Sequence, residues 1–296
     1  MATIIPSDMI LPKQRASGAH IAHLMPRNVL PQGLGPPRSD STVRSVSHAA
    51  TEALSAACAS MCCMTVHDVA RTLPGIPALH DLCRSLSMAE AIVNPGGEGR
   101  HHTFNRSWSR TEELASMRNG SGDEFDIVFS AAGAYVRGFA HESPLSPYHQ
   151  RDDYEPWPGV VDAVPAAFQR YVHEPLFTDE DGTPVVTVCL WRHAVADRWE
   201  TGDIDFPEGH PDPDGTTGLF GLLTRPEPEA FKTFAEDYYE TAVSLEALRH
   251  IYDLRPLDQA VIAMLSPLAP VTDVVQDALA IGYPISPALR TGPRTD

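Results

Sequence analysis

The sequence has no long hydrophobic run. Its longest mostly apolar stretches, such as residues 185–191, are far shorter than the roughly 18 residues that cross a bilayer. The sequence therefore predicts no membrane span. With 43% hydrophobic residues, the chain still has enough apolar surface to bury a sizeable core.

Cysteines are few, and their number is odd. An odd set does not form a complete disulfide framework, and adjacent Cys62 and Cys63 lack a second pair at the spacing of a zinc site. We therefore expect a reducing, cytoplasmic setting, with Cys189 in the core because it lies in an apolar run. The other cysteines are Cys58 and Cys83.

Positive charge is scarce and unevenly distributed. The net charge is -17, yet residues 1–63 carry more basic than acidic side chains, so the rest of the chain holds the whole negative excess. An acidic surface repels phosphate backbones, which argues against nucleic-acid binding. A basic protein is the partner that this charge favours.

Several motifs of catalytic and metal sites are incomplete. Gly120-Ser121-Gly122 lacks the spacing of a nucleophile elbow, and the acidic turns 179–182 and 212–215 lack the closing glutamate of an EF-hand. Prolines follow His141-Glu142 and His173-Glu174, so neither pair continues as a zincin helix. The pair His101-His102 carries no ligand spacing and is interpreted as chance. No metal and no cofactor are predicted.

Composition divides the chain into three parts. Residues 1–63 are rich in proline and contain no aromatic residue, which predicts a disordered tail. Met64 begins the change to a folded composition, and we hypothesise that translation starts there. Residues 64–285 are expected to form one domain, and residues 286–296 a disordered C-terminal end.

Hydrophobic periodicity predicts an α+β domain with an antiparallel sheet and a helical C-terminal half. Period-two spacing places Phe125, Ile127 and Phe129 of residues 124–130 on one strand face. In residues 134–140 it places Tyr135, Arg137 and Phe139 on one face, and the short loop between the two runs predicts a hairpin. Residues 184–191 resemble a central strand covered on both faces. Predicted helices span residues 71–88, 166–172, 227–240, 244–252, 258–265 and 272–281, with Ser244 and Thr272 as N-caps.

The stretch GFAHESPLSPY, residues 138–148, admits two interpretations. His141 and Glu142 follow a strand, where active sites gather, so they are candidates for an acid and base pair with Asp123 as a further carboxylate. Alternatively, the Ser-Pro pairs define a rigid strand exit whose polar side chains hold the loop backbone. The second interpretation is favoured because the cluster lacks a recognisable third partner.

Four distinctive motifs occur within about residues 72–284. They are NGSGDEF at 119–125, GFAHESPLSP at 138–147, PWPG at 156–159 and DPDG at 212–215. In these motifs the sequence resembles a family of proteins from actinomycetes and other bacteria, and the resemblance implies no catalytic role because no activity is assigned to that family. Ala140 stands where the family pattern has Asp before His-Glu-Ser, which argues against a catalytic carboxylate there.

The leading functional hypothesis is a non-enzymatic binding or immunity-type protein. In it, the hairpin and the proline-rich loop present aromatic and polar side chains to a basic partner, such as a nuclease toxin. The alternative is a hydrolase or transferase with His141 as base and Glu142 or Asp123 beside it. The predicted binding residues are Arg137, His141, Tyr148, Tyr154 and Trp157.

Overall fold

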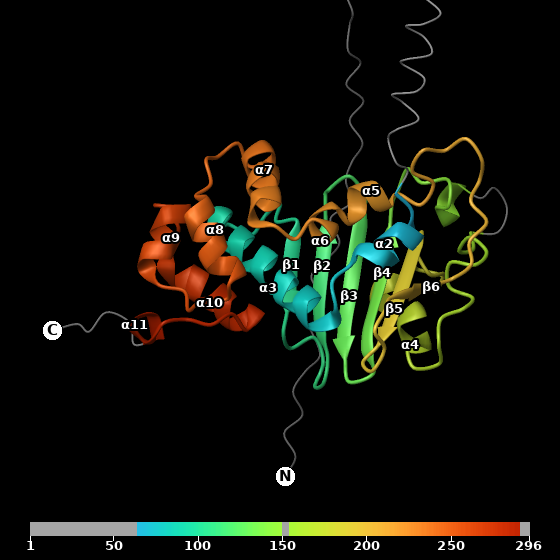
Figure 1. The fold of residues 1–296 in the computed structure, drawn as a ribbon, viewed down its shortest axis with the longest axis horizontal. Helices are drawn as coiled ribbons and strands as arrows, with labels where there is room; N and C mark the ends of the chain where they lie inside the picture. Colours follow the sequence, from blue (N-terminus) through green and yellow to red (C-terminus); the bar gives the residue numbers. More distant parts are fainter. Residues whose placement is uncertain (1–63, 150–153, 291–296) are drawn as a thin grey trace, which may run out of the picture. The chain divides into compact units, whose positions relative to one another are not determined.

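The computed structural model describes residues 64–149 and 154–290. These residues form an α+β fold, as predicted, built on a six-stranded sheet (Figure 1). The strands lie in the order β1-β2-β3-β4-β5-β6, and each is antiparallel to its neighbours. Antiparallel strands that follow one another in sequence can be joined by short loops, as β3 and β4 are, whereas the connection from β4 to β5 spans residues 140–187.

The sheet contains β1 (His102–Asn105), β2 (Glu113–Arg118), β3 (Glu124–Ser130), β4 (Gly133–Phe139), β5 (Val188–His193) and β6 (Glu200–Thr201). The helices before and within it are α2 (Val66–Thr72), α3 (Ile76–Val93), η1 (Pro147–His149), α4 (Gln169–Val172) and η2 (Pro175–Phe177). After the sheet come α5 (Thr216–Leu219), α6 (Gly221–Thr224), α7 (Pro228–Tyr238), α8 (Leu245–Tyr252), α9 (Gln259–Leu265), α10 (Val271–Ile281) and α11 (Pro287–Arg290).

The predicted hairpin is confirmed. β3 and β4 pair from Glu124↔Phe139 to Ser130↔Gly133, which leaves Ala131 and Ala132 as the turn. Gly138 in β4 allows α5 and the following Phe220 to approach closely, because a Cβ there would lie 3.0 Å from side-chain atoms of Leu219 and Phe220. The glycine of GFAHESPLSPY therefore allows Leu219 and Phe220 to pack closely against β4.

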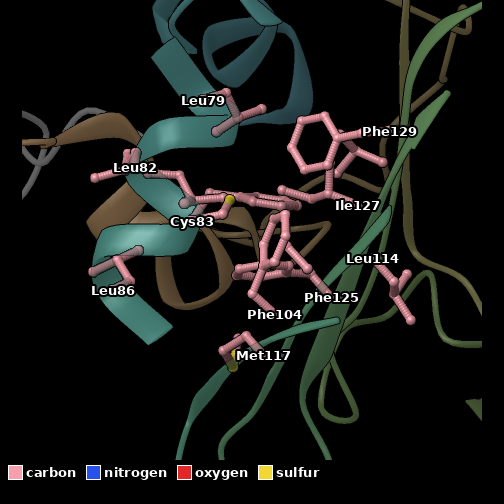
Figure 2. Packing of buried hydrophobic residues seen from close by; sticks show 14 of the residues in the cluster. Leu79, Leu82, Cys83, Leu86, Phe104, Leu114, Met117, Phe125, Ile127 and Phe129 are labelled. Atoms are coloured by element: carbon pink, nitrogen blue, oxygen red, sulfur yellow. The ribbon is translucent and has the colours of Figure 1, made fainter. Parts of the chain in front are cut away.

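Helix α3 covers one face of the sheet. Its apolar side chains Leu79, Cys83 and Leu86 meet the aromatic residues Phe104 and Phe125 (Figure 2). All five are buried, which accounts for the length of this helix, because burial of apolar area is what stabilises it. The helix was expected over residues 71–88 but begins at Ile76, because Pro74 separates it from α2 and Pro77 lies in its first turn.

The opposite face of the sheet contains a buried ionic network. Asp126 in β3 accepts hydrogen bonds from Arg137 Nε (3.1 Å), Arg118 Nη2 and Ser116 Oγ (2.6 Å), and Arg137 also pairs with Glu124. The Arg137 guanidinium lies 5.2 Å from the ring centre of Phe177. Arg137 is 1% exposed, so the expectation that it meets a partner is wrong. The chain after β4 covers the face on which it lies.

The C-terminal helices pack on α3 and on the β1 edge, as Figure 1 shows for α8 to α10. All four predicted helices begin within one residue of their expected start, and Ser244 caps α8 by accepting from Ala247 N. Thr272 was a wrong N-cap prediction. It lies inside α10, because the helix starts after Pro270.

Other strands were missed or misplaced. The predicted central strand begins at Val188 rather than Pro184, and only the two-residue β6 lies beyond it. The strands β1 and β2 were not predicted, and β1, with four residues, is too short to show a clear period. The helix expected over 166–172 is shortened to α4.

Two predicted end segments have different outcomes. Residues 1–63, with the hypothesised start at Met64, lie outside the described residues. Residues 287–290, which were expected in a disordered end, form the short helix α11. None of the helices in the described ranges is both long and apolar enough to cross a membrane.

The buried network predicts a strong effect of Asp126→Ala. Removal of this carboxylate leaves Arg137 buried with only Glu124 as its acid partner, so we expect the free energy of unfolding to fall by about 3 kcal/mol. Urea denaturation measures this change. Glu142→Ala is the control, because its side chain is 91% exposed and its loss should change stability by no more than about 0.5 kcal/mol. Equal losses of stability in Asp126→Ala and Glu142→Ala would contradict a structural role of the network.

Candidate functional site

The structure does not bring His141, Glu142 and Asp123 together as a catalytic set. The His141 side chain is half exposed, its Nε2 lies 3.9 Å from Glu142 Oε1, and Glu142 is almost fully exposed. Asp123 accepts from the backbone N of His141 (2.8 Å) and from the side chain of Asn119 (2.8 Å). This carboxylate therefore fixes the strand exit and does not orient the imidazole.

The serines of the same stretch hold the loop. Ser143 Oγ donates to the carbonyl of Pro213 (2.6 Å) and accepts from Leu145 N (3.1 Å), while Ser146 N donates to Ser143 O (2.9 Å). Both serines are buried. These bonds fix the loop backbone where the chain leaves β4, as in a rigid strand exit.

The predicted aromatic residues differ in exposure. Tyr148 is 44% exposed and Tyr154 57% exposed, whereas Trp157 is half-buried and donates to Asp205 O (3.0 Å). Two of the five predicted binding residues are thus large exposed aromatics. Arg137 is buried, and the side chain of His141 is exposed but has no carboxylate that orients its ring.

A second polar cluster, not predicted, centres on Glu90 of α3. Its side chain is fully buried, and both carboxylate oxygens are bonded. Oε1 lies 2.5 Å from His102 Nδ1, while Oε2 accepts from His101 N (2.6 Å) and from Tyr239 Oη (2.7 Å). One carboxylate thus joins α3, β1 and the end of α7.

These bonds determine the ionisation of Glu90. Burial by itself raises the pKa of a carboxyl, but the hydrogen bond and charge of His102, with the Tyr239 hydroxyl, lower the pKa of Glu90 below its ordinary value. An ionised carboxylate only accepts hydrogen bonds, so Nδ1 of His102 must carry the proton. In the neutral imidazole, Nε2 is then the unprotonated nitrogen.

Nε2 of His102 is left without a partner. Among the described residues no hydrogen bond reaches this atom. Nε2 of His101 is a buried atom without a partner, whereas Nε2 of His102 is not among such buried atoms. A histidine fixed by a carboxylate at Nδ1 and open at Nε2 has the arrangement of a general base.

His102 lines a cavity of about 290 Å³ between the sheet and the segment from α5 to α7. Its wall is both apolar and polar, with Phe125 and Phe234 beside the imidazole at ring-centre distances of 6.1 and 5.9 Å. Polar side chains enter from Asn119, Thr217 and Arg225. A cavity that combines aromatic side chains with a few convergent polar groups is typical of a site for a small ligand.

Neighbouring groups have pKa values that fit this environment. Burial lowers the pKa of His101, the charge of Glu90 opposes this effect, and His102 adds to it. Burial and the charge of Glu90 raise the pKa of Tyr239 well above its ordinary value, so its hydroxyl remains a donor. Shifted pKa values beside a cavity are a general indication of a functional site.

The sequence contains one signal that would have identified this cluster. Glu90 lies among apolar residues two positions beyond the predicted helix end at residue 88, and four positions after Leu86 of its apolar stripe, where an unpaired carboxylate is costly once the helix continues. Such a residue requires a buried partner, and the adjacent His101-His102 pair offered two. No pattern in the sequence shows which histidine meets it, since that depends on the pairing of β1 with β2.

Metal binding has little support here. Residues 64–149 and 154–290 contain no group of three or more His, Cys, Asp or Glu side chains arranged to hold an ion. The Glu90–His102 pair supplies only two donors, and its hydrogen bond occupies both facing atoms.

Comparison with known proteins gives no assignment. No protein-family model matches the chain, no curated protein matches it, and no solved structure matches it. Function is therefore inferred from the geometry of the site.

The two adjacent histidines predict opposite mutational effects. His101→Phe removes a buried nitrogen without a partner and keeps the aromatic contacts with Phe234 and Tyr238, so we expect the free energy of unfolding to rise by about 1 kcal/mol. His102→Phe removes one of the three bonds to buried Glu90 and should lower it by about 3 kcal/mol. Urea denaturation at pH 7.5 measures both.

The pH dependence of stability distinguishes the two histidines further. The folded state favours neutral His101, so its contribution is complete above its ordinary pKa of 6.5 and is lost as the pH falls through its lower folded pKa. Between pH 7.5 and 5, His101→Phe should lose less stability than the wild type. If the wild type and His101→Phe lose the same stability over this pH range, the assignment of this pH dependence to His101 is contradicted.

Proposed function

We propose that the protein is an enzyme of the hydrolase or transferase class, in which His102 acts as general base on a small anionic substrate in the cavity. The observation that supports this most strongly is the hydrogen bond between Glu90 and His102 Nδ1, which leaves Nε2 for chemistry. In this role Nε2 accepts a proton from a water or a substrate hydroxyl. Glu90 stabilises the imidazolium that forms.

Arg225 is the basis for an anionic substrate. It lines the cavity, is exposed, and donates through Nε to Gly221 O (3.3 Å). This bond uses one of the five N–H groups of the guanidinium. An arginine with free donors beside a general base can orient a carboxylate or phosphate by paired hydrogen bonds. The Asn119 amide and the Thr217 hydroxyl add neutral polar contacts.

The proposal is tested with mono-4-nitrophenyl succinate as an artificial substrate, because this ester carries the negative charge that Arg225 is proposed to bind. We expect hydrolysis above the buffer rate, and a fall in kcat of about 10²-fold or more for His102→Gln, because a general base contributes roughly that factor. Glu90→Gln should lower kcat with a smaller change in KM, because it acts by positioning His102. Release of nitrophenolate measures the rates.

His141→Gln is the matched control, since this half-exposed histidine lies outside the cavity lining. It should retain the wild-type rate. A thermal unfolding scan of each variant establishes that it is folded before its rate is compared. Loss of hydrolysis in His141→Gln with retention in His102→Gln would overturn the proposal.

A second function, binding of a basic protein partner, has its own supporting observation. Tyr148 and Tyr154 are exposed, and a groove of about 420 Å³ is lined by Glu155, Asp162 and Asp181 without any Lys or Arg. Partial burial, followed by the negative charges of Asp179 and Glu124, raises the pKa of Tyr148. Exposed tyrosines in an acidic field suit a cationic surface.

This second function predicts a selective loss of capture. Immobilised wild-type protein should retain a basic protein from the native host at low salt and release it at high salt. The double variant Tyr148→Ser, Tyr154→Ser should retain at least tenfold less. Tyr238→Ser on α7 is the control, because Tyr238 has the same 44% exposure as Tyr148. Equal retention by both variants would contradict the function.

A further inference from the structure

A second cavity, of about 440 Å³, lies at the carboxyl end of α10 and is distinct from the His102 site. Its wall includes Tyr283, Leu254 and the arginines Arg84, Arg106 and Arg290. The three arginines come from α3, from the residue after β1 and from α11. Three cations around one cavity are conspicuous in a chain of net charge -17.

The cavity is held by fixed backbone contacts. Tyr283 is buried, and its hydroxyl donates to Ile251 O (3.1 Å) and Arg255 O (3.0 Å). Arg84 donates to the carbonyl of Gly282, which satisfies one of the free carbonyls at the end of α10. The ordinary role of an arginine at a helix C-terminus thus accounts for Arg84.

Capping does not account for Arg106. Its side chain lies directly over Gly282, where a Cβ would be 2.5 Å from Arg106 Cδ. Its acid contact is a distant one, 4.0 Å from Nε to Glu113 Oε1, and the other oxygen of Glu113 is bonded to His80 (2.5 Å). Within the described residues no hydrogen bond of the Arg106 side chain is found. Its side chain is 63% exposed, so its guanidinium donors are accessible to a ligand.

Arg290 is similar. Its backbone N donates to Ser286 O (3.3 Å), but its guanidinium has no ion pair or hydrogen bond with another described residue. The acids near the cavity have other basic partners, and Asp253, whose charge acts on Tyr283, lies 3.7 Å from Arg255. Asp81 pairs with Arg84 at 3.4 Å, and Glu113 is shared between His80 and Arg106. Two guanidinium groups thus remain for an anion.

We propose that this cavity binds a small molecule through a phosphate or diphosphate group. Arginine guanidinium groups match phosphate oxygens by paired, charge-assisted hydrogen bonds. The volume lies within the range of cavities that hold metabolite-sized ligands. Apolar Leu254 and Ile285 beside the arginines provide contact area for the organic part. The site is independent of the reaction proposed at His102.

Isothermal titration calorimetry with sodium pyrophosphate tests the proposal on the full chain, against sodium chloride at equal ionic strength. We expect saturable binding of one pyrophosphate. The double variant Arg106→Gln, Arg290→Gln should weaken it roughly a hundredfold, or tenfold for each lost charge-assisted contact. Arg84 is left unchanged, because its bond to Gly282 supports the fold.

Arg198→Gln is the matched control, since Arg198 is exposed and does not line this cavity. It should bind pyrophosphate as the wild type does, and all three proteins should unfold at similar temperatures without ligand. Non-saturable heats, equal binding by the double variant, or tighter binding of citrate than of pyrophosphate would each overturn the phosphate site. Failure of hydrolysis at His102 would leave these results unaffected.

Discussion

The buried carboxylate of Glu90 is the interaction on which the site depends. It accepts three hydrogen bonds, from His102, from the backbone of His101 and from Tyr239. These donors come from the edge strand of the sheet and from the end of α7, while Glu90 itself lies on the central helix. A buried charge is costly unless fully paired, so the three elements must meet at this one place. The tautomer of His102 and the wall of its cavity follow from that requirement.

The sheet has a second buried charge cluster on its other face. Asp126 and Arg137 lie on neighbouring strands, where they are register partners, and Arg118 and Ser116 complete the cluster. Its groups are mutually satisfied, and it lines none of the cavities described above. The two clusters therefore have different consequences. The one at Asp126 holds the chain after β4 against the sheet, whereas the one at Glu90 leaves a ring nitrogen open.

The parts of the fold that the sequence predicted are those with a strong local signal. The hairpin of β3 and β4 follows from alternation at Phe125, Ile127 and Phe129, and α8 follows from its capping serine. The four-residue strand β1 has no such signal, yet it carries His102. The sequence also placed Arg137 on one strand face correctly. It could not show that Phe177 and Val185, about 40 residues later, cover that face.

The prediction of the site failed for a related physical reason. His141, Glu142 and Asp123 are near one another in sequence or across the hairpin, but their side chains point to solvent or to the backbone. Glu90 and His102 are twelve positions apart, and only the packing of α3 on β1 joins them. The local cluster of polar residues is therefore a strand exit, while the buried pair, which was not predicted, has a single carboxylate in an apolar helix as its only signal in the sequence.

The tautomer of His102 is the most direct test of this account. Long-range ¹H–¹⁵N correlation spectra of the imidazole nitrogens, recorded at pH 7.5 and assigned with His102→Gln, distinguish the protonated nitrogen from the bare one. The account predicts a protonated Nδ1 bonded to Glu90 and an unprotonated Nε2. A protonated Nε2 beside a bare Nδ1 would contradict it, because Glu90 would then have to carry a proton to make the observed bond.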